Sequence, residues 1–151
     1  MSVNGASSCG RDNNKQLDYD VIIIGAGVAG LYQLHCMREL GLRVRSYEAG
    51  SGVGGTWYWN RYPGARFDSE SWTYGYSFSK ELMNEWDWKE HFSSQPENER
   101  YLNYVADKFG LREDIQFNTT VTAAKYQEAE GSWDIILDTK EKVTSRFLIT
   151  A

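Results

Sequence analysis

The spacing of hydrophobic positions changes along this chain, and each spacing predicts a different kind of element. Residues 21–24 form a continuous β-branched run, typical of a strand buried on both faces, so a strand is predicted over Tyr19–Ile24. In residues 28–40 the apolar positions lie three apart, which predicts a helix that Gly41 ends. Residues 43–47 have strand character again. Together these segments predict a strand–helix–strand unit with parallel strands and a right-handed crossover.

The second half of the chain changes from helical spacing to the alternation of strands. Two helices are predicted over residues 80–92 and 97–109. Beyond Gly110 the apolar period falls to two, which predicts strands over residues 120–126, 133–137 and 147–150. The fold class is therefore α/β: a parallel sheet with flanking helices, and an antiparallel β-meander over about residues 120–140 as an appendage.

Composition and charge exclude several classes of protein. The chain has 151 residues and a net charge of −5, and no cluster of Lys and Arg marks a nucleic-acid partner. The longest apolar run is too short to cross a membrane, and two cysteines do not make a disulfide framework. A cytoplasmic location is expected. Residues 1–18 are polar and are predicted to be a disordered tail.

The first candidate site is a glycine fingerprint between the first predicted strand and helix. Gly25-Ala26-Gly27-Val28-Ala29-Gly30 has the form G-x-G-x-x-G. It directly follows a predicted strand and opens a predicted helix, which is the context that a dinucleotide site requires. There, Gly25 permits the tight turn, Gly27 lets the backbone approach a pyrophosphate, and Gly30 lets helix and strand pack closely. The pyrophosphate would lie on free N–H groups of the helix N-terminus, where the helix dipole favours an anion.

An acidic residue accompanies the fingerprint. Glu48 ends the second predicted strand, where a carboxylate accepts hydrogen bonds from a ribose 2′-OH. A carboxylate there repels a 2′-phosphate, so the site suits the ADP part of FAD or NAD and not that of NADP. The fingerprint does not separate FAD from NAD. In the alternative interpretation, residues 25–30 form a plain tight turn and Glu48 is a surface acid.

A second segment combines glycines with aromatic rings. It reads Gly54-Gly55-Thr56-Trp57-Tyr58-Trp59-Asn60-Arg61-Tyr62-Pro63-Gly64-Ala65-Arg66-Phe67-Asp68. A glycine pair lets a loop pass close to a ligand, and large rings can wall an isoalloxazine and exclude water. With Ser94-Gln95-Pro96 and residues 104–109 and 119–124, this segment is similar to the Baeyer–Villiger monooxygenases, the class B flavoprotein monooxygenases. The resemblance implies a Rossmann-like FAD-binding domain and covers about residues 19–151.

The resemblance also implies a reaction and a set of site residues. The family uses FAD, NADPH and O₂ to convert ketones to esters or lactones through a C4a-peroxyflavin. Asp68 matches a catalytic acid that orients an arginine in a later domain. A buried pair of Asp68 with that arginine would hold Asp68 ionised. Arg66, Phe67 and Asp68 match family positions on the NADP side of the site. The implied FAD neighbours, besides the fingerprint glycines and Glu48, are Gly55, Thr56, Trp57, Asp68, Tyr74 and Val121.

Family members also carry an NADP domain with a second glycine fingerprint, which this sequence lacks. Residues 19–151 are therefore expected to be the N-terminal part of a discontinuous FAD-binding domain, inactive in isolation, from an enzyme expected to be a monomer. Two alternatives stay open: an N- or S-oxygenating flavoprotein monooxygenase, and a non-catalytic dinucleotide-binding module. Among single residues, Trp57, Trp59 and Tyr74 have an alternative as core aromatics, and Asp68 as a local cap. No metal-ligand spacing is present in the sequence.

Overall fold

The computed structural model describes residues 16–151, so the tail prediction for residues 1–15, and Cys9 with it, lies outside the described residues. Leu17 and Asp18, also assigned to the tail, are attached to the folded part. Arg43 Nη1 donates to their carbonyl oxygens at 3.0 and 3.1 Å, and the Asp18 carboxylate accepts from the backbone N–H of Thr144 at 2.8 Å.

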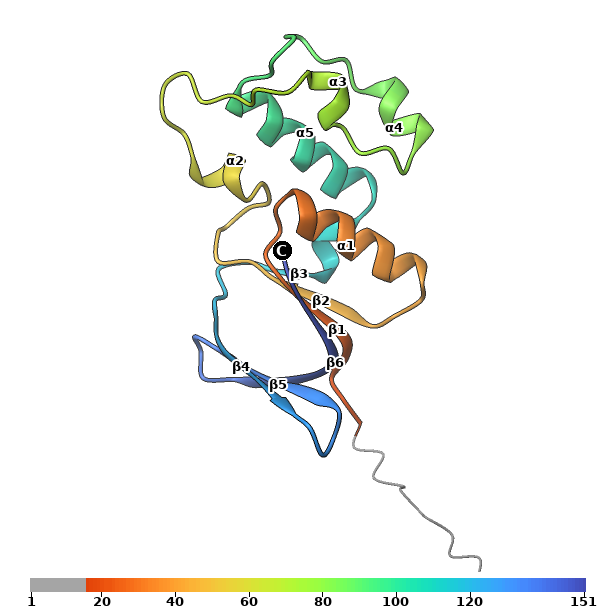
Figure 1. Ribbon diagram of the computed structural model, residues 1–151, viewed down its shortest axis with the longest axis vertical. Helices are drawn as coiled ribbons and strands as arrows, with labels where there is room; N and C mark the ends of the chain where they lie inside the picture. The colour runs from red at the N-terminus through yellow and green to blue at the C-terminus, as the bar shows by residue number, and fades with distance from the viewer. Residues whose placement is uncertain (1–15) are drawn as a thin grey trace, which may run out of the picture.

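One mixed sheet organises the chain, which confirms the α/β class (Figure 1). Its strands lie in the order β3-β2-β1-β6-β5-β4. The pairs β1–β2, β1–β6 and β2–β3 are parallel, and β5 is antiparallel to both β4 and β6. The strands are β1 (Tyr19–Ile24), β2 (Val44–Tyr47), β3 (Ile115–Gln116), β4 (Val121–Gln127), β5 (Ser132–Leu137) and β6 (Lys142–Thr150).

Strand β6 joins the meander to the parallel sheet, so the meander is not an appendage. Residue Ser145 pairs with Trp133 of β5 on one side and with Tyr19 of β1 on the other. The sequence predicts only residues 147–150 of this strand. Residues 142–146 were missed because Val143 is the one apolar residue among them, and a strand held by neighbours on both edges does not need apolar alternation.

Helices cover one face of the parallel strands. The longest are α1 (Val28–Glu39) and α5 (Gln95–Lys108), both close to prediction; three shorter helices lie between them along the chain, and a 3₁₀ helix follows α5. The shorter helices are α2 (Thr56–Trp59), α3 (Ser71–Tyr74), α4 (Lys80–Glu85) and the 3₁₀ helix η1 (Leu111–Asp114).

The predicted helix over residues 80–92 is wrong beyond Glu85. Trp86 is extended, and the rings of Trp86 and Trp88 both pack on Tyr101, with centroids 5.2 and 4.9 Å away. Residues two apart point to the same side of an extended chain but not of a helix. Burial of both indoles on one tyrosine therefore favours the extended conformation.

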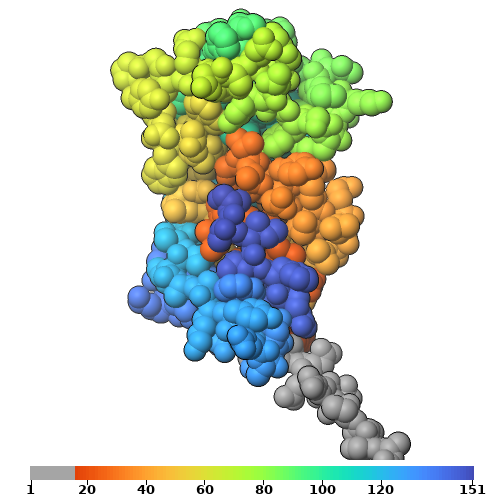
Figure 2. All heavy atoms as spheres, in the orientation of Figure 1, coloured from red at the N-terminus to blue at the C-terminus, as the bar shows by residue number. Residues whose placement is uncertain are grey.

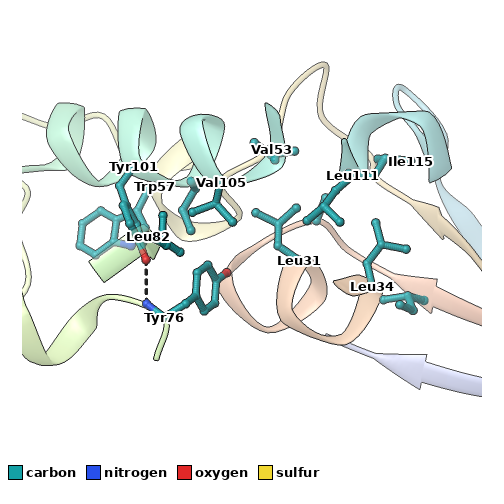
Figure 3. Packing of buried hydrophobic residues seen from close by; sticks show 14 of the residues in the cluster. Leu31, Leu34, Val53, Trp57, Tyr76, Leu82, Tyr101, Val105, Leu111 and Ile115 are labelled. Carbon is teal, nitrogen blue, oxygen red and sulfur yellow. Dashed lines mark hydrogen bonds between the residues drawn. The ribbon is translucent and has the colours of Figure 1, made fainter. Parts of the chain in front are cut away.

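The parallel strands are buried on both faces, as their apolar run requires. On the helical face, Leu31 and Leu34 of α1 point toward Leu111 and Ile115, and the hydroxyl of Tyr101 accepts from the Tyr76 N–H at 2.7 Å (Figure 3). On the opposite face a second cluster joins strands β1 and β2 to the meander: Ile22, Tyr47, Ile135, Leu137 and Val143.

Candidate dinucleotide site

The fingerprint forms the turn from β1 into α1 and tolerates no side chain at two of its glycines. Gly25 has a φ of +103° and donates its N–H to the carbonyl of Tyr47 at 2.8 Å. A Cβ added to Gly30 would lie 2.2 Å from the carbonyl oxygen of Gly25. The turn lies at the carboxyl end of β1, between β2 and β6. Ligands of α/β sheets bind at such a point, where the strand order reverses.

The N-terminus of α1 is open to an anion. Its N-cap is Gly27, which has no side chain to accept from the first turn, and that turn carries no acidic residue. Its first N–H groups thus lack a side-chain cap within the described residues. In Figure 2 the start of α1 lies beside the dark blue end of the chain, where the Ala151 N–H donates to Ile24 at 2.9 Å.

The second glycine segment packs on the first, backbone against backbone. A Cβ on Gly55 would lie 2.8 Å from the Cα of Gly27, and one on Gly27 would lie 3.2 Å from the Cα of Gly55. The Gly54 N–H donates to the carbonyl of Ala26 at 3.0 Å. Gly55, expected beside the flavin, is therefore also the residue that lets the two loops meet.

Glu48 connects these loops. Its carboxylate accepts from the N–H of Ala26 through Oε2 and from the N–H of Gly50 through Oε1, both at 2.7 Å. The residue is only 5% exposed, so the alternative that it is a surface acid is wrong. A carboxylate offers about four acceptor positions, so the two bonds leave capacity for ribose hydroxyls.

The segment that carries Val121 starts beside this acid. The N–H groups of Asn118 and Thr119 donate to the carbonyls of Gly50 and Glu48, each at 3.0 Å. Val121 follows as the first residue of β4. The structure therefore ties the residues that lead into the predicted adenine neighbour to the backbone of Glu48 and Gly50.

Three of the aromatic residues implied by the resemblance form one cluster. Trp57 Nε1 donates to the Tyr74 hydroxyl at 2.7 Å, and Phe67 stacks on Tyr74 with centroids 4.5 Å apart. Trp57 and Phe67 are 6% and 7% exposed, so Trp57 is a core residue, as the alternative interpretation has it, whereas Trp59 is 60% exposed and is not. Phe67, expected on the nicotinamide side, is buried within the described part of the chain. Thr56 begins α2 and is exposed.

Asp68 follows the buried Phe67 and is exposed. Within residues 16–151 no hydrogen bond or ion pair of its carboxylate is present, and α3, which begins three residues later, has no side-chain cap. The interpretation of Asp68 as a local cap is therefore wrong. Arg66 is engaged elsewhere: its Nη1 donates to Glu90 Oε2 and to the Phe92 carbonyl, both at 3.0 Å.

A buried polar network holds the bend that carries Asp68, and the sequence reasoning missed it. Ser71 Oγ donates to the Glu90 carbonyl at 2.6 Å and accepts from the Ser93 N–H at 3.1 Å. Ser93 Oγ in turn donates to Glu97 Oε2 at 2.8 Å. The spacing of Ser94 and Glu97 is that of a capping box, but Glu97 bonds to Ser93 and to the Lys89 N–H instead.

Comparison with known proteins places this geometry in a family. Residues 18–149 match the flavin-binding monooxygenase-like family, and the chain belongs to it. It is 52% identical over 131 residues to an acetone monooxygenase (methyl acetate-forming) of Gordonia sp. (strain TY-5), covering 87% of this chain and 25% of that protein. It is 48% identical over 140 residues to the phenazine N-monooxygenase PhzNO1 of Lysobacter antibioticus, covering 92% and 26%.

Solved structures agree with the fold. The crystal structure of OTEMO in complex with FAD and NADP superimposes with a TM-score of 0.86 at 51% identity, over 91% of this chain and 26% of that one. The chain thus spans about a quarter of the length of the relatives it matches. Among the described residues, no helix has the length and apolar character of a membrane span, and no group of His, Cys, Asp and Glu is arranged for a metal ion.

Proposed function

We propose that the protein to which this chain belongs is an FAD- and NADPH-dependent Baeyer–Villiger monooxygenase that acts on a ketone with O₂, and that this chain binds the ADP part of FAD. The observation that carries the binding role is the junction at Glu48. There the buried Glu48 carboxylate accepts hydrogen bonds from both glycine loops. The loops can approach each other this closely because Gly27 and Gly55 have no side chains. The N-terminus of α1, which has no side-chain cap, begins at the same place. The acetone-oxidising relative supports the reaction class.

Each group of site residues is proposed to bind a different part of the cofactor. We assign Gly25, Gly27, Gly30 and the α1 N-terminus to the pyrophosphate, Glu48 to the ribose, and Val121 to the adenine. We assign Gly55, Thr56, Trp57 and Tyr74 to the flavin, which supplies the oxygenation chemistry when bound. The Trp57–Phe67–Tyr74 cluster, in which Trp57 and Phe67 are buried and Tyr74 is half-buried, supplies a wall behind it.

Asp68 is proposed to orient a cation supplied by another part of the protein. Its carboxylate is exposed yet follows directly on a buried ring, so its position is fixed while its charge is available. Arg66 and Phe67 are proposed to support the NADP side, Arg66 through its ion pair with Glu90 and Phe67 by packing beneath Asp68.

A second function has a specific observation in its favour. The phenazine N-monooxygenase matches 92% of this chain at 48% identity, so N-oxygenation of an aromatic heterocycle is the competing reaction. The two reactions differ in the atom that receives oxygen, which product analysis distinguishes.

The test uses the complete polypeptide encoded by the reading frame that contains this chain. We expect flavin absorbance in the purified protein, NADPH consumption that depends on a ketone such as acetone or cyclohexanone, and the matching ester or lactone as product. N-oxide from phenazine with no ester from any ketone would establish the second function. Bound flavin without NADPH oxidation with either substrate would favour the non-catalytic module.

A further inference from the structure

The loop between Glu48 and the aromatic segment is wound around one side chain. A Cβ on Gly50 would lie 2.7 Å from Cε1 of Tyr58, and one on Gly52 would lie 3.3 Å from Cε2 on the opposite ring edge. A Cβ on Gly54 would lie 3.1 Å from the Tyr58 Cβ. Every second residue of this loop is therefore a glycine because the loop encircles the Tyr58 side chain.

The hydroxyl group of Tyr58 holds the loop at its turning point. It accepts from the Ser51 N–H at 3.1 Å and shares a hydrogen bond of 2.8 Å with Ser51 Oγ. The Arg61 guanidinium lies over the ring, 5.2 Å from its centroid. The ring thus has partners at its edges, its hydroxyl and one face.

This loop leads directly into the proposed cofactor site. The N–H of Gly50, the glycine nearest the ring, donates to Glu48 Oε1 at 2.7 Å. At the other end of the loop, Gly55 contacts the Cα of Gly27. A displacement of the ring would therefore move both the ribose acid and the second glycine loop, although Tyr58 itself touches neither Ala26 nor Gly27 in any described contact.

We propose that Tyr58 is a positioning residue for the ADP part of the cofactor: its ring is the template on which the Gly50–Gly55 loop is wound, and it holds Glu48 and the pyrophosphate loop in their binding geometry. The proposal rests on the proposed function. A preformed site loses less conformational entropy on binding, so removal of the template lowers affinity even where no ligand contact is removed.

The test measures the dissociation constants of FAD and of ADP with the apo form of the complete polypeptide, by calorimetry, together with its unfolding temperature. The variants are Tyr58→Phe, Tyr58→Ala, Gly50→Ala and the double variant Gly50→Ala/Tyr58→Ala. The matched control is Tyr62→Ala, which removes a tyrosine of the same segment that is 63% exposed.

We expect Tyr58→Ala to weaken the binding of FAD and of ADP by the same factor, about tenfold or more. The preorganisation that is lost concerns the ADP part, which both ligands share. Tyr58→Phe keeps the ring and loses only the hydrogen bonds to Ser51, so both dissociation constants should rise about fivefold. Gly50→Ala should weaken both ligands in the parent protein and add a smaller factor once Tyr58 is Ala, because the 2.7 Å contact of the new Cβ with the ring is then absent and only its 3.1 Å contact with Glu48 Oε1 remains.

Three results would overturn the proposal. They are additive effects of Gly50→Ala and Tyr58→Ala, a loss of FAD affinity with ADP unchanged, and a lowered unfolding temperature with both dissociation constants unchanged. If the parent protein binds neither FAD nor ADP, the proposed function fails and the proposal with it. If the parent binds both and the Tyr58 variants bind equally well, only the role of Tyr58 fails.

Discussion

The carboxylate of Glu48 is buried, and each of its oxygens already accepts a backbone N–H at 2.7 Å. A neutral amide of the same size has one acceptor oxygen, so in Glu48→Gln the NH₂ group must face one of the two N–H donors. A buried donor without a partner costs about 1–3 kcal/mol. We therefore expect Glu48→Gln to lower the unfolding free energy by that amount and to weaken ADP binding as well.

Chemical denaturation and ADP titration measure the two effects of Glu48→Gln. Glu39→Gln, at the exposed end of α1, is the control and should change neither. Wild-type stability and affinity in Glu48→Gln would contradict the view that this carboxylate joins the loops.

Gly30 gives a second prediction at this scale, because two effects there have opposite signs. Alanine in a helix is favoured over glycine by about 1 kcal/mol, which alone would make Gly30→Ala stabilising. The added Cβ would however lie 2.2 Å from the Gly25 carbonyl oxygen, a backbone atom that cannot rotate away. Overpacking costs about 1–3 kcal/mol, so we expect net destabilisation and a weakened ADP site.

The control for Gly30→Ala is Gly64→Ala, where the new Cβ meets open space and only the positive φ of +81° opposes it. That variant should lose about 1–2 kcal/mol through backbone strain and keep its affinity for ADP. A Gly30→Ala protein that is more stable than the parent would show that helix and strand can separate there without cost.

At the scale of elements, regular spacing was informative and short or irregular segments were not. Strand β1 has a continuous apolar run and helix α1 repeats its period for long enough, so both could be predicted. Strand β3 has two residues and helices α2 and α3 have four each, too few to show a period. Residues 86–92 have helical spacing but are not helical: Trp86 is extended and residues 89–92 form bends, since packing of Trp86 and Trp88 on Tyr101 overrides local preference.

The candidate site likewise contains features that the sequence predicts and features that it does not. The fingerprint and Glu48 could be predicted because their chemistry is local in sequence. The network of Ser71, Ser93 and Glu97 could not, because it joins residues more than twenty positions apart whose types are ordinary at a surface.

That network gives a prediction for the segment that carries Asp68. Ser93→Ala removes the donor to Glu97 and leaves a buried carboxylate oxygen and the Ser71 hydroxyl with fewer partners. We expect a loss of about 1–3 kcal/mol in stability. We also expect faster amide hydrogen exchange at residues 67–71, because Ser71 and Phe67 are both tied to residues 91–93. The adjacent Ser94→Ala serves as control; equal exchange in the two variants would contradict the prediction.

At the scale of the whole molecule, strand β6 makes the meander, predicted as an appendage, part of the same sheet as the parallel strands. It is parallel to β1 and antiparallel to β5, and the meander covers the face of the parallel strands that the helices leave open. Tyr47 lies at this junction. It belongs to β2, yet it packs in the cluster with Ile135, Leu137 and Val143 of the meander.

Burial at this junction makes stability sensitive to alkaline pH. Burial raises the pKa of Tyr47 from about 10 to about 12, since the phenolate is disfavoured away from water. A group whose folded pKa is raised stabilises the fold fully below its unfolded pKa, and that contribution is lost as pH rises through the folded pKa. The unfolding free energy should therefore fall between pH 10 and pH 12. Burial likewise raises the pKa of Tyr101 to about 12, so it contributes over the same range.

Tyr47→Phe keeps the ring in the junction and removes its titration. We expect a shallower decline in unfolding free energy from pH 10 to pH 12, while Tyr101 and Tyr76, whose pKa burial also raises, preserve the remainder of the slope. Urea denaturation at half-unit pH steps measures this, with the exposed Tyr62→Phe as control. An unchanged slope in Tyr47→Phe would mean that the meander opens and hydrates Tyr47 before the sheet unfolds. A reduced slope would indicate that both halves lose their structure together, as one continuous sheet requires.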